Sequence, residues 1–304
     1  MLQKTRYIWQ DGKFVPWQAA RVHVLTHSLH YGAAVFEGIR FYETENGVAI
    51  FRLEEHVDRL FRSAKSIYIK IPFSKQQIKK AIVECVARNR IKSGYIRPLA
   101  FYGYGIMGVD PSKSPVNVII ACWPWGIYLG THKARVKISS YMRIHPKSLH
   151  ADMKVSGHYV NSILAGHEAR VKGYTEAIFL DFQNKVAEGS GENIFIVKNC
   201  MIYTPKLKGQ ILPGITRDTI IKLSRDLGIK VIEKDLTKQE LYNVDELFFT
   251  GTAVEIHEIE SVDGKQIRNK NKNCSGIAAQ MKELYSQVVR GKVPRYRKWL
   301  TYVK

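Results

Sequence analysis

The sequence predicts a mixed α/β fold in two domains. Runs of helical period, such as Leu53 to Ile67, alternate with short β-rich runs, such as Thr175 to Leu180. No internal repeat, low-complexity segment or coiled-coil period interrupts this alternation. The composition loosens at Trp125 to Thr131, which reads Trp-Gly-Ile-Tyr-Leu-Gly-Thr. We therefore predict a small N-terminal α/β domain over residues 1–126, a linker over 127–133 and a large C-terminal domain over 134–304.

The N-terminal half shows two hairpin turns and two amphipathic helices. Asp11-Gly12 and Asn46-Gly47 are dipeptides typical of tight hairpins. Residues 27–40 mix small and aromatic side chains, which favours a functional loop that leads into a strand. The predicted helices are 53–67 and, after a Ser74/Gln77 capping box, 75–91; the predicted strands are 95–103 and 116–123.

The C-terminal half continues with strands and helices of ordinary length. A capping box at Thr237 and Glu240 predicts a short helix. The other predicted elements are strand 135–139, helix 158–172, strand 175–180, the hairpin 194–197 with 201–203, helix 219–227, strand 247–249 and a final helix at about 276–290.

Size and composition are those of an ordinary globular protein. The chain has 304 residues, of which 45% are hydrophobic, and no long apolar run follows Met1. We expect neither a signal peptide nor a transmembrane span, and a cytoplasmic location. The four cysteines lie far apart and lack metal-ligand spacing, so we expect reduced, buried thiols and no metal site.

The formal net charge of +20 favours a different function, the binding of polyanions, because basic surfaces attract them. The positive charge is dispersed, with its densest run at Arg290 to Lys298, and no nucleic-acid module accompanies it. We predict a solvated basic surface that binds neither nucleic acid nor membrane. The alternative is a polyanion-binding protein on a decayed enzyme fold, and the reason for the high charge stays open.

The stretch from Lys154 to Glu192 carries the candidate chemistry. Lysine forms Schiff bases with carbonyl compounds, and a site for pyridoxal phosphate adds a partner for the pyridine nitrogen. Lys154 and Glu188 suit these two roles, and Tyr159 suits a hydrogen bond to the phenolic oxygen of the ring. The alternative interpretation of Lys154, taken alone, is an ordinary surface lysine.

A phosphate-binding helix start follows downstream. Gly214 allows a close backbone approach, and the amides of Ile215 and Thr216 at a helix start favour a dianion. Taken alone, Thr216 also fits an ordinary N-cap.

Several motifs carry a family resemblance that extends over most of the chain. The pattern Glu188-x-Ser-x-x-Asn193 followed by Leu212-x-Gly-Ile-x-Arg217 resembles the class IV aminotransferases, which are fold type IV pyridoxal phosphate enzymes. The chain is similar to the branched-chain amino acid aminotransferases in particular, in the motifs His30-Tyr-Gly32, Val35-Phe-Glu-Gly-Ile-Arg40, Tyr95-Ile-Arg-Pro98, Pro124-Trp-Gly126 and Thr250-Gly-Thr-Ala253.

The resemblance implies an α+β fold with two α/β domains, of the type found in D-amino acid aminotransferase, in which the large domain carries the cofactor lysine. It also implies transamination between L-leucine, L-isoleucine or L-valine and 2-oxoglutarate, a reaction of branched-chain amino acid biosynthesis. Lys154 would act as the base that moves the substrate α-proton. The implied contacts to pyridoxal 5'-phosphate are Arg59, Lys154, Tyr159, Glu188, Leu212, Ile215, Thr216 and Thr252.

The substrate contacts are likewise implied by the resemblance. Arg97, with Tyr31 and Tyr128, would meet the distal carboxylate of glutamate, and Thr252 with Ala253 the α-carboxylate. The remaining implied contacts are Phe36, Gly38, Tyr95, Met107, Val109 and Trp125. Tyr31, Met107 and Val109 would come from a partner subunit, so a homodimer with shared active sites is implied, and a hexamer built as a trimer of dimers is left open.

Four of the implied contacts also have an interpretation that needs neither substrate nor cofactor. Arg59 fits a surface ion pair with Glu55, Tyr31 and Phe36 fit plain packing, and Arg97 before Pro98 fits a surface charge at a strand end. Within the same fold, a D-amino acid transaminase or an aminodeoxychorismate lyase shares the lysine, the glutamate and the phosphate site. The order of preference among leucine, isoleucine, valine and aromatic substrates, and the physiological direction, stay open.

Overall fold

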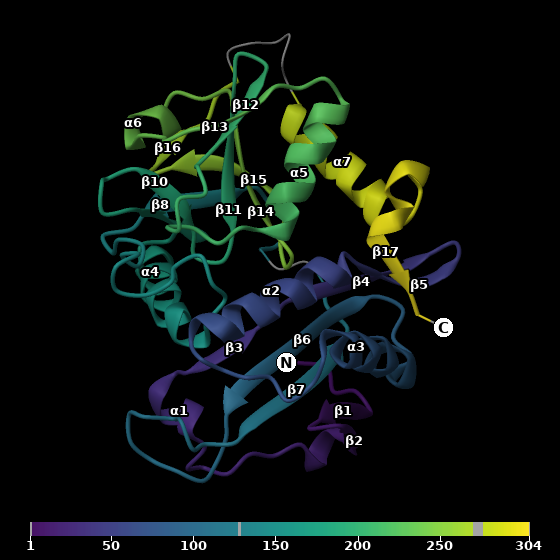
Figure 1. Cartoon of the computed structure of the whole chain (residues 1–304). Coiled ribbons are helices and arrows are strands. Elements are labelled where there is room, and N and C mark those ends of the chain that lie inside the picture. The colour runs from purple at the N-terminus through teal and green to yellow at the C-terminus, as the bar shows by residue number, and fades with distance from the viewer. Residues whose placement is uncertain (1, 127–128, 270–275, 304) are drawn as a thin grey trace. The chain divides into compact units, whose positions relative to one another are not determined.

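Two sheets organise the chain, one in each of two compact units (Figure 1). The computed structural model describes residues 2–126, 129–269 and 276–303. Unit 1 consists of Met1–Gly126, Met153–Gly157 and Val288–Lys304, and unit 2 of Ile127–Asp152 and His158–Gln287.

The first unit boundary, at 126/127, is the start of the predicted linker. The grouping differs from the predicted division in that Met153–Gly157, with Lys154, and Val288–Lys304 pack within unit 1. The physical reason is backbone pairing, because Val155 bridges to Val35 and strand β17 (Leu300–Tyr302) pairs with β5 (Gly47–Phe51). The predicted domains, as parts that fold independently, stay a prediction.

In unit 1 the described strands form one sheet in the order β17-β5-β4-β6-β7-β1-β2, with β3 also paired to β6. Its elements are β1 (Tyr7–Gln10), β2 (Lys13–Pro16), η1 (Trp17–Ala19), α1 (His27–Tyr31), β3 (Ala34–Phe36), β4 (Ile39–Thr44), β5, α2 (Leu53–Ser66), α3 (Lys75–Asn89), β6 (Gly94–Tyr102), β7 (Val116–Trp123), η4 (Pro294–Trp299) and β17.

Both predicted hairpins form, the second with its turn one residue earlier. Asp11 and Gly12 have φ values of 48° and 93°, the left-handed pair that a tight hairpin needs. In the second hairpin Thr44 pairs with Gly47, so the turn residues are Glu45 and Asn46. The hydroxyl of Thr44 accepts from the Asn46 amide at 3.1 Å and donates to the Gly47 carbonyl at 2.7 Å, which fixes the turn at this position.

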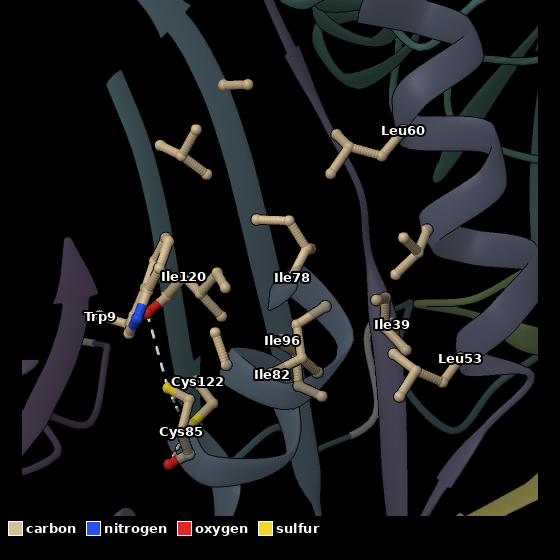
Figure 2. Close-up of a cluster of buried hydrophobic side chains, with 14 of the residues drawn as sticks. Trp9, Ile39, Leu53, Leu60, Ile78, Ile82, Cys85, Ile96, Ile120 and Cys122 are labelled. Atoms are coloured by element: carbon tan, nitrogen blue, oxygen red, sulfur yellow. Dashed lines mark hydrogen bonds between the residues drawn. The ribbon is translucent and has the colours of Figure 1, made fainter. Parts of the chain in front are cut away.

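The core of unit 1 lies between its sheet and helices α2 and α3. Leu53 and Leu60 point from α2 toward the strands, and Ile78 and Ile82 of α3 pack into the same cluster (Figure 2). The predicted capping box at Ser74 and Gln77 is present and begins α3. The apolar faces that the sequence predicts for both helices are therefore the faces that build this core.

The cysteines only partly follow the prediction. Cys85 and Cys122 are buried, free thiols whose sulfur atoms lie 3.6 Å apart in the core of unit 1. Cys200 in contrast is exposed and disulfide-bonded, so the prediction of reduced, buried thiols is wrong for this residue. It sits in the turn between two strands, where no core covers it.

In unit 2 the described strands form a second sheet in the order β10-β9-β8-β15-β14-β11-β12-β13, with β16 also paired to β15. Its elements are β8 (Ala134–Ile138), η2 (Ser156–His158), α4 (Tyr159–Val171), β9 (Glu176–Leu180), β10 (Val186–Gly189), β11 (Asn193–Lys198), β12 (Met201–Thr204), α5 (Ile215–Asp226), β13 (Val231–Glu233), α6 (Lys238–Leu241), β14 (Glu246–Gly251), β15 (Glu255–Val262), β16 (Lys265–Gln266) and α7 (Ile277–Val289), of which η2 begins within unit 1.

The predicted helices of unit 2 end close to their expected bounds, but α5 begins at Ile215, four residues before the predicted start at 219. α4 is followed by Gly173 at φ 78° and α5 by Gly228 at φ 73°, conformations that favour glycine. The predicted capping box at Thr237 and Glu240 begins α6. No helix within the described ranges is both long and apolar enough to cross a membrane.

Candidate functional site

The backbone of Lys154 is fixed within unit 1 beside strand β3. The amide of Lys154 donates to the Ser63 hydroxyl at 3.0 Å, and its carbonyl accepts from the Phe36 amide at 3.2 Å. The side chain is half-buried, and its Nζ lies 4.9 Å from the centre of the Phe36 ring. This setting does not suit an ordinary surface lysine, because a mobile solvated side chain needs neither a fixed backbone nor an aromatic face.

Arg59 is buried on α2 and pairs with Glu37. Its Nε donates to Glu37 Oε1 at 2.6 Å and its Nη2 to Glu37 Oε2 at 2.9 Å, a two-bond contact. The alternative of a surface ion pair with Glu55 is wrong, because Glu55 pairs with Arg52 at 2.7 Å. The fold therefore holds the guanidinium inside unit 1 rather than at its surface.

A buried histidine completes this cluster. His56 Nδ1 lies 2.7 Å from Glu37 Oε2, and both residues are almost fully buried. Burial would raise the pKa of Glu37, but Arg59 and His56 outweigh it and hold this pKa well below its ordinary value. Burial lowers the pKa of His56, and Arg59 and Lys154 add to that effect against the opposing carboxylate of Glu37.

Acidification below the ordinary histidine pKa of 6.5 is expected to lower the free energy of unfolding through His56. The folded-state pKa is the lower one, so the unfolded chain binds the proton first. The contribution of the neutral imidazole is therefore present above pH 6.5 and is lost as the pH falls through the folded-state pKa. Denaturant unfolding of the wild type and His56→Gln at several pH values measures it; parallel pH dependence of the two proteins would contradict the assignment.

Arg97 lies within a group of aromatic rings in unit 1. Its guanidinium carbon is 4.5 Å from the Phe36 ring centre and 5.4 Å from that of Tyr95. The Tyr95 ring packs in turn on Trp125, with ring centres 5.2 Å apart. Arg97 is half-buried within β6, so the alternative of a surface charge at a strand end is wrong. Among the described residues its buried Nε has no hydrogen-bond partner, which suits an arginine that binds a ligand.

Gly38 lies directly against the hydroxyl of Tyr95. A Cβ atom built on Gly38 would fall 1.7 Å from that oxygen, so no larger residue fits without moving the ring. Gly38→Ala is expected to lower the free energy of unfolding by about 1–3 kcal/mol by overpacking, and to raise KM for amino acid substrates about tenfold. Gly126→Ala is the matched control, because, apart from its neighbours in the chain, no atom of the described residues lies within 4 Å of its added methyl group. Unchanged KM in Gly38→Ala would remove Tyr95 from the substrate contacts.

The residues implied to reach a partner subunit lie on the surface of unit 1. Tyr31 is 44% exposed, Met107 44% and Val109 86%. The ring of Tyr31 contacts that of His27 in a tilted arrangement, with ring centres 4.5 Å apart. Phe36 is buried, so packing and a substrate contact are both consistent with its position. Tyr128 lies outside the described residues.

Glu188 is the centre of the corresponding group in unit 2. Its carboxylate is buried and accepts from Arg143 Nε at 2.8 Å, from Asn193 Nδ2 at 3.2 Å and from the Leu212 amide at 3.1 Å. Arg143 also donates to the Ala151 carbonyl, and Asn193 to the Leu212 carbonyl at 2.9 Å. With these donors the carboxylate is stabilised as an anion in a fixed direction.

The start of α5 is joined to this carboxylate through Leu212. Gly214 is the N-cap, so no side chain caps the first turn. The interpretation of Thr216 as an ordinary N-cap is wrong, because Thr216 is the second residue of the helix and is buried. A Cβ on Gly214 would fall 2.0 Å from the Asn193 side-chain oxygen, which explains the glycine. An uncapped helix start of this kind favours an anion.

Three further predicted residues lie in unit 2. Tyr159 is half-buried and is the first residue of α4. Thr252 and Ala253 are half-buried in the turn that joins β14 to β15. Since Thr250 pairs with Asn193 across β14 and β11, this turn begins beside the strand that follows Glu188.

Three functional candidates were missed by sequence reasoning. Arg143 precedes its partner Glu188 by 45 residues, and no local pattern marks it. Glu37 stood inside a quoted motif without a role, and His56 shares the buried face of α2 with Arg59. A histidine and an arginine on the apolar face of an amphipathic helix are the signal that identifies such a cluster.

Comparisons with known proteins extend these observations. A family model for class IV aminotransferases matches residues 34–262. The branched-chain-amino-acid aminotransferase of Pseudomonas aeruginosa is 44% identical over 308 residues, covering 100% of this chain and 99% of that protein. The crystal structure of a branched-chain aminotransferase from Thermoproteus uzoniensis with norvaline has a TM-score of 0.94 and 42% identity, and covers 99% of this chain and 100% of that chain.

A second solved structure has the same fold with a cofactor adduct. It is the branched-chain amino acid aminotransferase of T.th. complexed with N-(5'-phosphopyridoxyl)-L-glutamate, at a TM-score of 0.93 and 44% identity over 99% of each chain. The predicted α+β fold, with one sheet in each of the two units, and the resemblance stated from the motifs are both confirmed. The family model and these relatives show that the chain belongs to the class IV aminotransferases.

Proposed function

We propose that this chain transfers the amino group of L-leucine, L-isoleucine or L-valine to 2-oxoglutarate, with pyridoxal 5'-phosphate as cofactor. The products are the branched-chain 2-oxo acid and L-glutamate. One observation carries the proposal. The buried carboxylate of Glu188 accepts from the Leu212 amide at 3.1 Å, and Leu212 leads directly into the uncapped start of α5.

This arrangement fits the two ends of pyridoxal phosphate. A fixed anionic carboxylate stabilises a protonated pyridine nitrogen, and an uncapped helix start stabilises a phosphate dianion. When bound, the cofactor supplies a carbonyl that links to amines and a ring that withdraws electrons from the substrate α-carbon. Glu188 would hold the ring nitrogen, and Leu212, Ile215, Thr216 and Thr252 would hold the phosphate end in unit 2.

The other cofactor contacts act through their own side-chain chemistry. Lys154 would bind the cofactor carbonyl and, once its amine is released, move the α-proton of the substrate. Arg59 would donate to the phosphate, where a planar fork is more directional than a lysine. Tyr159 would donate its hydroxyl hydrogen to the phenolic oxygen of the ring.

Substrate binding must accept a branched apolar side chain and the charged side chain of glutamate. Phe36, Tyr95 and Trp125 supply apolar surface in unit 1, and Arg97 within the same group supplies a cation. We infer that Arg97 with Tyr31 and Tyr128 binds the distal carboxylate, while Thr252 and Ala253 bind the α-carboxylate. Gly38 leaves the space that the Tyr95 hydroxyl occupies.

The proposed assembly is a homodimer in which Tyr31, Met107 and Val109 enter the partner's site. Their exposure supports this, because only side chains at the surface of a subunit can reach a partner. Sedimentation velocity of the purified protein distinguishes this dimer from a hexamer built as a trimer of dimers. The proposed location is the cytoplasm, where amino and 2-oxo acids are exchanged, and the proposal includes neither nucleic acid nor membrane as a partner.

The visible absorption spectrum of the purified protein tests the proposed reaction. We expect the band of lysine-bound pyridoxal phosphate, its loss on addition of L-leucine and its return on addition of 2-oxoglutarate. A protein that stays colourless with added cofactor would overturn the enzyme assignment and favour a polyanion-binding role. A band that responds to D-alanine but not to L-leucine would move the chain to the D-amino acid transaminases.

A further inference from the structure

Glu37 is a fully buried acid in the turn that joins β3 to β4. Its own amide donates to the Pro98 carbonyl at 2.9 Å, which fixes its backbone. Its carboxylate accepts from Arg59 Nε at 2.6 Å, from Arg59 Nη2 at 2.9 Å and from His56 Nδ1 at 2.7 Å. None of the roles proposed above uses this residue.

The partners of Glu37 share one face of α2 with a residue that holds Lys154. His56, Arg59 and Ser63 are three and four positions apart, so they lie along the same side of the helix. Ser63 accepts from the Lys154 amide at 3.0 Å. One buried helix face thus carries both the arginine and the anchor of the candidate lysine.

We propose that Glu37 is a positioning residue that fixes the direction of the Arg59 guanidinium toward the cofactor phosphate. The inference rests on the proposed function, because it needs a phosphorylated cofactor. A guanidinium is planar and rigid, so fixing Nε and Nη2 against one carboxylate also fixes the direction of Nη1. A displaced arginine would still carry its charge but would lose the alignment of its hydrogen bonds.

Charge alone does not explain the cluster. Burial works against the anion of Glu37, but Arg59 and then His56 keep the pKa of this carboxyl low, so it stays ionised. The carboxylate therefore offsets the positive charge of Arg59 and reduces its attraction for a phosphate. Since Glu37 weakens the attraction of Arg59 for a phosphate, its role must depend on the geometry of the contact. A substitution that keeps the negative charge but moves the carboxylate separates the effect of geometry from that of charge.

Glu37→Asp is that substitution, because the shorter side chain keeps the anion but withdraws it by one methylene group. Glu55→Asp is the matched control, since Glu55 lies on α2, the helix of Arg59, and pairs with Arg52 at 2.7 Å. The full-length proteins are dialysed against graded pyridoxal phosphate and, in a parallel series, against pyridoxal, which lacks the phosphate. Bound ligand is read from its absorption.

Glu37→Asp is expected to raise the Kd for pyridoxal phosphate about tenfold and to leave the Kd for pyridoxal within about twofold of the wild type. Glu55→Asp is expected to change neither value. In an Arg59→Lys background, Glu37→Asp is expected to add less than about a twofold change, because the two residues act as one unit. We expect the wild-type Kd for pyridoxal phosphate only in proteins that carry glutamate at position 37.

Other outcomes would overturn the inference. An equal loss of affinity for both ligands would make Glu37 a merely structural residue, and unchanged affinity for both would give it no role. A full additional loss in the Arg59→Lys background would separate it from Arg59. Failure of the proposed function is distinguishable, because the wild type itself would then bind neither ligand, or would bind both equally well.

Discussion

Lys154→Ala is expected to abolish transamination, with kcat lower by at least about 10⁴-fold, because one side chain serves as both the carbonyl anchor and the base for the α-proton. Its fixed position beside Phe36 supports this dual role. The substitution removes an amine at a half-buried site while the backbone bonds to Ser63 and Phe36 remain available. We therefore expect a folded, inactive protein.

The measurement combines steady-state kinetics with the absorption spectrum. Lys154→Ala should lack the band of lysine-bound cofactor and still unfold near the wild-type midpoint. Lys65→Ala is the control, because Lys65 is an exposed lysine on α2. Small soluble amines should partly restore proton transfer in Lys154→Ala if the missing group is a base. Activity within about tenfold of the wild type would exclude Lys154 as the catalytic base.

Glu188→Gln is expected to lower kcat by about 10²–10³-fold, because an amide cannot stabilise a protonated ring nitrogen as a carboxylate does. The same change leaves the buried guanidinium of Arg143 without its anion. We expect this to lower the free energy of unfolding by about 3–5 kcal/mol, the usual effect of breaking a buried ion pair. Loss of rate and loss of stability must therefore be separated.

The double variant Arg143→Met with Glu188→Gln separates them. Methionine removes the unpaired charge and fills a similar volume, so much of the lost stability should return. The activity should not return, because the carboxylate is still missing. Recovery of both quantities together would mean that Glu188 acts only through the stability of unit 2. Denaturant unfolding and kcat measured on the same preparations decide between these results.

Most of the elements follow from local sequence patterns. Hairpins, capping boxes and amphipathic faces depend on residues within a few positions of one another, so the sequence locates α2, α3 and α6 closely. The predicted turn of the second hairpin was one residue off, because the hydrogen bond from the Thr44 hydroxyl to the Gly47 carbonyl fixes the turn at the preceding position. The prediction also failed for Cys200, because the spacing of cysteines along the sequence does not indicate which of them are exposed.

In the candidate site, too, the sequence predicted some features and missed others. The lysine, the glutamate and the helix start were identified from motifs, and the family followed from their combination. The ion-pair partners of the buried charges were not identified from motifs. The sequence favoured Glu55 for Arg59 because that residue is one turn away, but the fold supplies Glu37 from a different segment. Arg143 could not be paired with Glu188 from a pattern, since the two meet only when their strands and loops assemble.

The sequence by itself therefore determined the fold class and the family, and it supplied the candidates for the reacting side chains. The tertiary structure decided which buried charges compensate one another and that Lys154 packs within unit 1. The physical reason is the separation along the chain over which each interaction acts. Backbone preferences and caps act over a few residues, whereas a buried carboxylate takes whichever donor the packing of distant segments brings to it.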